Sequence, residues 1–413
     1  MTKQFDVLIV GGGPAGSVAA ANLMGAGLSV CILDRAHFPR LKPCGGGLSF
    51  RIYRRFPYLA DVLRSVPTNF VRRLVFEAPS GEAVEFTAPA SEPPLYAMIR
   101  RTELDHALVR HCVAGGVGLR EGVTVAKVET MPESVCVTSV AGEIFAAKLL
   151  IGADGVNSAV AVAAGLRGPW PPERIAMDAT EESPQTALQA RLDTMYIFYG
   201  RDHAYGYGYL FPKAQHVSFG VGYRVDSMRQ YIRETPMAMH EEFLEQLKQR
   251  DAVEGASQKE NFHPWVLPVG GPMERLSIER VLIAGDAAGF VNGFTAEGVY
   301  YAMVSGELAG KAALTVLKEN DLSAASLKRY DRTCEAEMGY ELRKSVELQR
   351  RLMRNPKLLN SAVRFAQRSP AARRLLCAYG VGQIGYRQMK RRALTEALPA
   401  YLRYKAEKLW ARI

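Results

Sequence analysis

The sequence predicts an α/β protein with a Rossmann-like nucleotide-binding domain, an inserted antiparallel β-sheet domain and a C-terminal helical region. Three observations predict this class: a glycine-rich turn after the first apolar segment, hairpin and strand patterns in mid-chain, and apolar residues at helical spacing beyond residue 320. A chain of 413 residues also exceeds one typical core, so more than one domain is expected.

The chain opens with the pattern of a nucleotide-binding βαβ unit. Residues 5–10 are typical of a short buried parallel strand, and G-x-G-x-x-G follows at once, where a helix must begin. We expect Gly11 to permit the tight turn and Gly13 to bring backbone N–H groups to a pyrophosphate. Gly16 would let the helix pack closely on the strand, and Ala15 beside it is a further expected contact.

A second strand completes this unit. Residues 28–33 are predicted to form it, and Asp34 ends it at about the distance expected for the acid that binds a ribose. Both strands and the acid are in register, so the glycines predict a dinucleotide site in preference to a merely structural turn.

A later segment favours a flavin over a nicotinamide as the resident cofactor. Residues 280–286 are typical of another buried strand, and Asp286 at its end can hydrogen-bond a ribityl hydroxyl, which nicotinamide dinucleotides lack. A helix expected to start near Thr295 would aim its positive N-terminal end at the flavin. Gly298 and Val299 would offer backbone groups there.

The segment 42–49 places a thiol directly before three glycines. Glycines let a backbone approach a flat ligand closely, so Gly45 and Gly47 suit the edge of a flavin ring. Cys44 would then lie beside the redox centre. Three roles stay open for its thiol: a proton donor or relay, a group that tunes the flavin, or a small apolar contact.

Together with the Asp-Gly turn in residues 151–158, these segments resemble the glutathione-reductase-type FAD fold of the para-hydroxybenzoate hydroxylase group. That group usually carries an arginine a few residues later, which residues 159–161 lack. The resemblance also implies that Arg101, at the start of an Arg-x-x-apolar-Asp helix, contacts FAD. The alternative for Arg101 is a surface side chain that opens an amphipathic helix.

The cysteine loop narrows the resemblance to the geranylgeranyl reductases, which saturate prenyl chains. That family has a Pro-Cys-Gly-Gly-Gly loop, and later Tyr-x-Trp-x-Phe-Pro, seven residues and Gly-x-Gly. Residues 207–212 and 220–222 keep this spacing, with Tyr209 at the tryptophan position. The resemblance spans roughly residues 3–315. It implies FAD-dependent reduction of double bonds in a geranylgeranyl or other polyprenyl group of a lipid, quinone, diphosphate or chlorophyll-type substrate, with NADPH or reduced ferredoxin as electron donor.

An aromatic strand is the predicted substrate wall. Alternate side chains of a strand face the same side, which gives one aromatic surface formed by Tyr205, Tyr207, Tyr209 and Phe211. Reduction of an isolated alkene plausibly needs a proton at one carbon and hydride at the other, and aromatic faces stabilise the developing cation. We therefore expect these residues to bind substrate and Tyr207 and Tyr209 to take part in catalysis. A sheet surface packed on its own domain is the alternative.

The predicted domains are interleaved. The FAD-binding domain comprises residues 1–50, 97–175 and 275–320, the substrate-binding domain 51–96 and 176–274, and the helical region 321–413. Residues 72–86 predict a hairpin that turns at Ser80-Gly81, and residues 186–225 predict further strands.

Basic charge is concentrated at the C-terminal end. Residues 321–413 hold 21 Lys and Arg against 8 Asp and Glu, within a chain of net charge +10. Three segments predict helices that attract anionic lipid or pyrophosphate: 342–354, 358–367 and 394–410. A solvated face packed on the FAD-binding domain is the alternative. No nucleic-acid motif accompanies the charge, so that partner is not expected.

The remaining patterns limit location and chemistry. No long apolar run or signal peptide is visible, which predicts a cytoplasmic protein, with a peripheral position on the cytoplasmic membrane face as the alternative. Six cysteines without a C-x-x-C pair and seven scattered histidines favour reduced thiols and no metal site. Two rival functions remain: a flavin monooxygenase or halogenase, and an electron-transfer protein without prenyl turnover.

Overall fold

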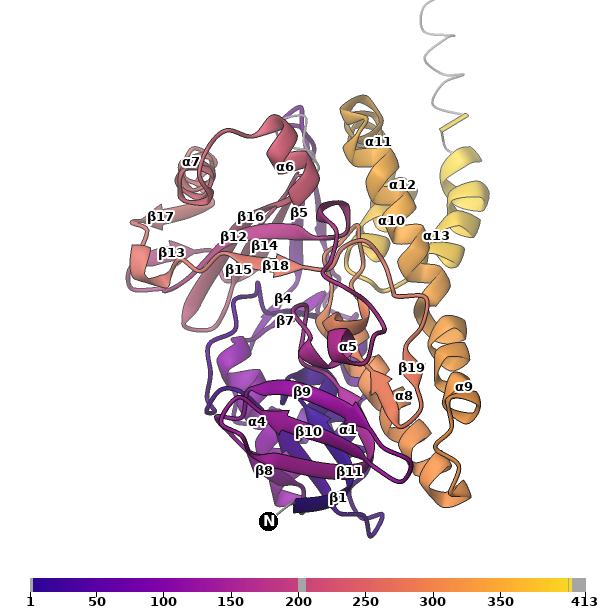
Figure 1. The fold of residues 1–413 in the computed structure, drawn as a ribbon. Coiled ribbons are helices and arrows are strands. Elements are labelled where there is room, and N and C mark those ends of the chain that lie inside the picture. Colours follow the sequence, from indigo (N-terminus) through magenta and orange to yellow (C-terminus); the bar gives the residue numbers. More distant parts are fainter. Residues whose placement is uncertain (1–2, 200–205, 400, 403–413) are drawn as a thin grey trace, which may run out of the picture.

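The computed structural model describes residues 3–199, 206–399 and 401–402, and it has the predicted mixed α/β architecture. Figure 1 shows two main sheets, with the C-terminal helices along one side of both. The two sheets come from interleaved parts of the chain, so segments distant in sequence meet between them.

The first sheet carries the predicted βαβ unit. It has eight strands in the order β19-β20-β11-β1-β2-β8, with β10 paired to β11 and β9 to β10. Strands β8, β2, β1, β11 and β20 run parallel, so their carboxyl ends share one edge. The strands are β1 (Lys3–Val10), β2 (Val30–Leu33), β8 (Gly118–Arg120), β9 (Val125–Thr130), β10 (Val135–Ser139), β11 (Ile144–Gly152), β19 (Ser277–Ile278) and β20 (Val281–Ile283).

Apolar side chains of the parallel strands and of the helices beside them form one core. Val7–Val10 are buried on both faces of the sheet, as expected of a parallel strand covered by helices. The helices are α1 (Pro14–Ala21), α4 (Arg101–Ala114), α5 (Ala159–Ala163), α8 (Val299–Glu319) and α9 (Ala324–Cys334).

The helix expected to start near Thr295 begins at Val299 instead, and this prediction was wrong by one turn. The Asn292 side chain accepts hydrogen bonds from the N–H groups of Phe294 and Thr295, which stabilises a loop there. Ala296 has a φ of 56°, a left-handed conformation that a helix does not contain.

The second sheet is the inserted one. It has seven strands in the order β18-β12-β16-β15-β14-β5-β6, antiparallel except for β14 with β5. The predicted hairpin of residues 72–86 is its β5–β6 edge. The strands are β5 (Arg73–Glu77), β6 (Ala83–Thr87), β12 (Ala176–Pro184), β14 (Thr194–Tyr199), β15 (Gly206–Pro212), β16 (His216–Arg224) and β18 (Trp265–Leu267).

Different helices pack on the two faces of this second sheet. One face packs against α7 (Pro236–Lys248), where Phe243 and Leu244 meet Phe219, and α6 (Val225–Tyr231) lies beside it. The other face packs against C-terminal helices through Leu359 and Leu375. These helices are α10 (Tyr340–Met353), α11 (Pro356–Arg368), α12 (Pro370–Gly380) and α13 (Tyr386–Arg392). The expected helices 342–354 and 358–367 correspond to α10 and α11, whereas most of 394–410 lies outside the described residues.

Smaller elements connect the sheets. Strands β3 (Gly47–Ser49), β7 (Tyr96–Met98) and β4 (Asn69–Val71) form a three-stranded sheet, and β13 (Leu188–Ala190) pairs with β17 (Val253–Gly255). Helices α2 (Arg51–Arg55) and α3 (Leu59–Val62) place Ile52 and Leu59 in the core of the first sheet. The predicted domain boundaries stay a prediction.

Candidate active site

The turn after β1 requires glycine at two of the predicted positions. Gly11 has a φ of +102°, and a Cβ there would lie 2.3 Å from the Ala153 carbonyl oxygen. A Cβ on Gly16 would lie 1.9 Å from the Gly11 carbonyl oxygen. The turn therefore packs against both its own helix and the end of β11, which leaves no room for side chains.

Asp34 holds this turn. Its carboxylate accepts hydrogen bonds from the N–H groups of Gly12 at 2.8 Å and Ala36 at 2.9 Å, and it lies 3.6 Å from Nε of Arg40. The sequence predicts that Asp34 binds a ribose. In the structure, the carboxylate of Asp34 also fixes the glycine turn through these hydrogen bonds.

Two guanidinium groups face the beginning of α1. A Cβ on Gly13 would have Nη2 of Arg40 at 3.6 Å and Nη2 of Arg101 at 4.0 Å as its nearest neighbours. Arg101 is 8% exposed and donates two hydrogen bonds of 2.8 Å to Asp105, so the surface alternative for Arg101 is wrong. A helix N-terminus without a side-chain cap, beside two arginines, is suited to a pyrophosphate.

The downstream motif meets this turn. A Cβ on Gly285 would lie 3.0 Å from Cβ of Ala15, so the end of β20 contacts the start of α1. A Cβ on Gly298 would lie 3.4 Å from Oδ1 of Asp286, which puts that carboxylate beside the start of α8. Val299 is the first residue of α8. Tertiary structure thus brings the two predicted cofactor motifs together.

The cysteine loop packs against the aromatic strand β15. A Cβ on Gly45 would lie 2.7 Å from the Phe211 ring and 3.0 Å from the Tyr209 ring. Gly46 has a φ of +70°, and its N–H contacts Sγ of Cys44 at 3.4 Å. The Cys44 carbonyl accepts a hydrogen bond of 3.4 Å from the Ser218 hydroxyl. The loop is therefore fixed against β15 and β16.

A cavity lies where the cysteine loop, β15 and the start of α8 meet. The space within its lining, open solvent at the mouth included, is about 980 Å³. Its lining includes the predicted site residues Cys44, Gly45, Gly47, Tyr207, Tyr209, Phe211, Gly298 and Val299. The predicted flavin-edge and substrate residues therefore share one cavity.

Three of the four predicted aromatic residues lie in the described part of the chain and form a continuous row. Ring centroids are 6.0 Å apart between Tyr207 and Tyr209 and 4.8 Å apart between Tyr209 and Phe211. Tyr205 lies outside the described residues. The row faces the cavity, so the alternative of a surface packed only on its own domain does not hold for these three residues.

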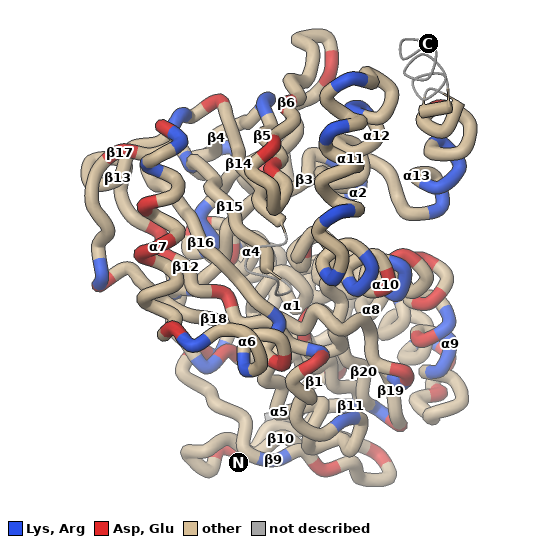
Figure 2. The backbone as a smooth tube through the Cα atoms, turned by 90° about the horizontal axis from the view of Figure 1, so that it is seen from above, with Lys and Arg blue, Asp and Glu red and all other residues tan. Residues whose placement is uncertain are grey.

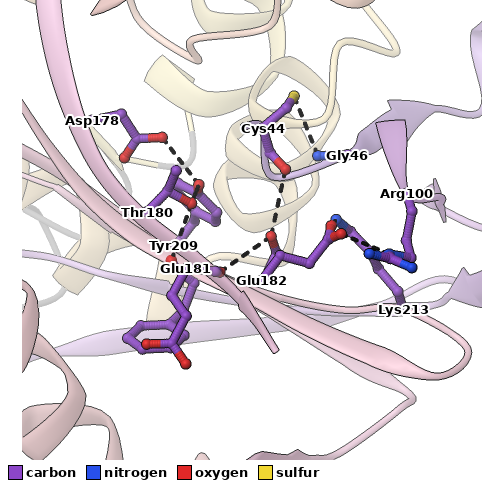
Figure 3. Close-up of polar contacts among 11 residues, drawn as sticks. Cys44, Gly46, Arg100, Asp178, Thr180, Glu181, Glu182, Tyr209 and Lys213 are labelled. Carbon is purple, nitrogen blue, oxygen red and sulfur yellow. Dashed lines mark hydrogen bonds and ion pairs between the residues drawn. The ribbon is translucent and has the colours of Figure 1, made fainter. Parts of the chain in front are cut away.

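Asp178 is a cavity residue that the sequence analysis did not find. Its Oδ2 accepts a hydrogen bond of 3.0 Å from the Tyr209 hydroxyl, which is also 2.7 Å from Oγ1 of Thr180 (Figure 3). Burial raises the pKa of Asp178 to about 6, although the Tyr209 hydrogen bond opposes the shift. The available signal was the Gly-x-Gly of β16, since a Cβ on Gly220 would lie 2.8 Å from both Oδ1 of Asp178 and the Tyr209 hydroxyl.

A buried ion-pair cluster supports the cysteine loop from the other side. Lys213 is 1% exposed and pairs with Glu182, which also accepts a 2.7 Å hydrogen bond from Arg100 (Figure 3). Burial raises the pKa of Glu182, but the two cations more than offset this and hold it below its ordinary value. A Cβ on Gly46 would lie 2.1 Å from the Ile99 carbonyl oxygen and 3.0 Å from Nζ of Lys213, so the backbone of Ile99 leaves room only for glycine and the cluster lies directly beside it.

Glu297 is a second cavity carboxyl that the sequence analysis missed. It pairs with Arg51 at 2.5 Å, and the Arg51 guanidinium stacks 3.7 Å from the Tyr300 ring centroid. Burial raises the pKa of Glu297, while Arg51 opposes the shift.

Among the described residues, no group of His, Cys, Asp and Glu could hold a metal ion, and no helix is long and apolar enough to cross a membrane.

Comparisons with known proteins agree with this geometry. The FAD binding domain family matches residues 4–339. The geranylgeranyl diphosphate reductase of Rhodobacter capsulatus is 30% identical over 339 residues, which are 79% of this chain and 79% of the relative. The chain belongs to the geranylgeranyl reductase family. A second member, the digeranylgeranylglycerophospholipid reductase of Methanocaldococcus jannaschii, is 28% identical over 340 residues, 80% of this chain and 82% of its own.

Solved structures share the fold of this family member. A geranylgeranyl bacteriochlorophyll reductase-like protein from Thermoplasma acidophilum has a TM-score of 0.78 at 19% identity, over 96% of this chain and 100% of its own. A myxobacterial chondrochloren halogenase has a TM-score of 0.65 at 21% identity, over 82% of this chain and 80% of its own. Such low identities concern the fold alone.

Membership makes the chain an FAD-dependent oxidoreductase, and its residues fit that cofactor. The glycine turn and the guanidinium groups of Arg40 and Arg101 suit a pyrophosphate. The ribose role of Asp34 and the ribityl role of Asp286 stay predictions. Arg40 was not found from the sequence. Asp105 is the aspartate of the Arg-x-x-apolar-Asp motif, but its contacts with Arg101 and Arg40 appear only in the folded molecule.

Proposed function

We propose that this enzyme reduces carbon–carbon double bonds in a geranylgeranyl or other polyprenyl group carried by a lipid, quinone, diphosphate or chlorophyll-type molecule. The observation that carries the proposal is the cavity in which the cysteine loop, the start of α8 and the aromatic row meet. When bound, FAD supplies a hydride to one alkene carbon. The chain's own residues bind the prenyl group, exclude water and stabilise positive charge.

The aromatic row has the properties that a prenyl site needs. Tyr209 and Phe211 are buried, so their rings offer a dry apolar surface for the chain. Their faces also stabilise a cation that develops on the alkene. We assign Tyr205, Tyr207, Tyr209 and Phe211 to substrate binding, and Cys44 to the flavin side of the cavity as a catalytic candidate.

The test is a single-turnover reaction. The purified flavoprotein is reduced without oxygen and mixed with geranylgeranyl diphosphate or with a digeranylgeranyl lipid, and flavin absorbance and product mass are followed. We expect the oxidised-flavin absorbance to return together with a product two hydrogens heavier for each saturated bond. A flavin that stays reduced with both substrates would reject the proposal. Turnover only with oxygen would support a monooxygenase or halogenase.

The electron donor is proposed to be NADPH or reduced ferredoxin. Stopped-flow reduction of the oxidised flavoprotein by each donor separates them, because the true donor bleaches the flavin within the time of one turnover. Electron exchange with a quinone or a protein, without any prenyl product, would instead support the electron-transfer alternative.

The C-terminal helices are proposed to contact an anionic membrane surface where the substrate resides. Exposed Arg387, Lys390 and Arg391 on α13 precede exposed Leu394 and Leu398. Figure 2 shows basic residues along α13 and its neighbours. Basic groups beside exposed apolar side chains are the combination that binds a lipid headgroup region.

A further inference from the structure

Hydride addition to an alkene requires a proton donor at the other carbon, and this inference rests on the proposed prenyl reduction. The donor must face the cavity, must carry a proton before the reaction and must regain one afterwards. Isolated double bonds are weakly basic, so a carboxylic acid is a stronger candidate than a hydroxyl.

Two carboxyl groups line the cavity among the described residues. Glu297 has a buried oxygen without a hydrogen bond, Oε1, and burial raises its pKa, but its Oε2 is paired with Arg51 at 2.5 Å, which favours the ionised form. Asp178 has no ion-pair partner within 4.0 Å among the described residues, and its Oδ1 is buried without a hydrogen bond. An unpaired oxygen in a dry site is costly as part of a carboxylate and far less so as part of a neutral acid.

We propose that Asp178 is the proton donor of the reaction and that Tyr209 positions it. The O–H bond of the Asp178 carboxyl breaks, and the π electrons of the alkene form a C–H bond to that proton. The adjacent carbon then accepts the hydride from reduced FAD, which also releases a proton. Asp178 recovers one proton from solvent, so the alkene gains two hydrogens and the flavin becomes oxidised.

The hydrogen bonds favour the proton on Oδ1, the carboxyl oxygen that has no hydrogen-bond partner. The Tyr209 hydroxyl donates to Oδ2. Oγ1 of Thr180 lies 2.7 Å from the same hydroxyl and 3.3 Å from the Phe219 carbonyl oxygen, and it can donate its one proton to the nearer Tyr209 oxygen. The acid proton then belongs on Oδ1. After donation, the same Tyr209 bond stabilises the carboxylate, so the network needs no rearrangement.

The surrounding charges agree with a group that is protonated in mildly acidic solution. Burial raises the pKa of Asp178, while Tyr209, His240 on α7 and Lys42 in the cysteine loop oppose the shift. Tyr207 on β15 also faces it, and the Asp178 charge contributes to the raised pKa of that phenol. The opposing groups are weaker than the burial effect, so the pKa of Asp178 is raised to about 6.

The decisive variants are Asp178→Asn and Tyr209→Phe, with Glu254→Gln as a control that removes an exposed carboxylate on β17 of the same part of the molecule. We expect Asp178→Asn to keep bound FAD and prenyl-substrate affinity but to slow single-turnover flavin reoxidation by about 10²–10⁴-fold. Tyr209→Phe should shift the pH profile of that rate, whereas Glu254→Gln should match the original enzyme.

A second readout is independent of turnover. The infrared difference spectrum between acidic and neutral pH should contain a protonated-carboxyl band that Asp178→Asn removes and Glu254→Gln keeps. If Asp178→Asn does not fold, Tyr209→Phe is the deciding variant. Loss of the Tyr209 hydrogen bond alters the environment of Asp178, so it must change both the pH profile of the reoxidation rate and the protonated-carboxyl band.

The outcomes separate the inference from the proposed function. If the original enzyme yields no saturated product with either prenyl substrate, both are rejected. If it yields product and Asp178→Asn reoxidises within about threefold of its rate, only the inference is rejected. Loss of the reaction in Cys44→Ala alone, with Asp178→Asn active, would assign the proton to the thiol instead.

Discussion

Gly220 and Gly222 lie on the same strand of the second sheet, but the space beside them differs. A Cβ on Gly220 would lie 2.8 Å from Asp178 Oδ1, whereas a Cβ on Gly222 would have the Met177 carbonyl at 3.3 Å as its nearest neighbour. The first glycine thus makes room for the Asp178–Tyr209 pair. The second lines the cavity without touching that pair as closely.

We predict that Gly220→Ala destabilises the protein by about 1–3 kcal/mol and slows flavin reoxidation, because the methyl group overlaps Asp178 and Tyr209. Gly222→Ala should have the smaller effect on both. Urea unfolding and single-turnover absorbance measure the two quantities. Equal effects of the two variants would contradict this account of the Gly-x-Gly motif.

The pKa of Asp178 predicts a pH dependence with a definite sign. Its ordinary value of 3.8 is raised to about 6 in the folded protein, so the folded state binds more protons between these values. Its contribution to stability is present below about pH 4 and is lost as the pH rises to about 6. The reoxidation rate should also fall as the pH rises through about 6. Unfolding and rate profiles of the original enzyme that match those of Asp178→Asn at every pH would contradict this.

Arg101 and Asp105 form a buried pair at the predicted cofactor turn. We predict that Arg101→Gln costs about 3 kcal/mol of stability, at the lower end for a broken buried pair because Arg40 stays 3.3 Å from Asp105. FAD should also dissociate more readily, as judged by the flavin that passes a centrifugal filter. Arg64→Gln breaks an exposed pair with Asp61 and should leave both quantities nearly unchanged.

At the scale of elements, α1 and α8 approach so closely that their backbones touch. A Cβ on Gly306 would lie 2.1 Å from the Ala15 carbonyl, and one on Gly310 would lie 2.7 Å from the Ala19 carbonyl. Because α1 begins at the glycine turn and α8 at Val299, this contact fixes both predicted cofactor motifs relative to each other.

Gly306→Ala is therefore expected to separate the two helices and to weaken FAD binding together with stability. Gly380→Ala is the matched control, since Gly380 ends helix α12 with open space around it. That control should be neutral or more stable by about 0.5–1 kcal/mol, because alanine favours the helix. Thermal unfolding with and without added FAD distinguishes the two variants, and unchanged FAD affinity in Gly306→Ala would refute the positioning role.

At the scale of the whole molecule, the C-terminal helices cover one face of the second sheet and also line the cavity. Leu359 and Leu375 complete the sheet core, and Gln349 and Met353 of α10 reach the cavity. A basic surface on the same helices would bring a membrane-borne prenyl chain near its site. Removal of these helices would expose the sheet core, so surface variants are the better test.

We predict that Lys390→Glu combined with Arg391→Glu weakens binding to phosphatidylglycerol vesicles in cosedimentation by at least about thirtyfold, because each of the two basic groups near the surface contributes about 1 kcal/mol. Both side chains are exposed, so folding and turnover of a detergent-dispersed substrate should be unchanged. Equal binding to neutral phosphatidylcholine vesicles, or no loss in the double variant, would contradict an electrostatic membrane contact.

The sequence by itself determined the features that depend on local order: the βαβ unit with its glycines, the Gly-Asp strand end, the β5–β6 hairpin and the aromatic alternation on β15. These follow from spacing along a few residues. The start of α8 was misplaced because Asn292 and Ala296 favour a loop that apolar periodicity does not reveal.

Only the tertiary structure decided which distant groups share the cavity. Asp178, Glu297 and Lys213 carry no motif, and each acquires its properties from burial and from partners far along the chain, such as Tyr209 and Arg51. A single carboxyl has the same ordinary pKa wherever it stands in a sequence. Its charge state depends on the solvent it loses and the neighbours it gains on folding, and these are properties of the packed molecule.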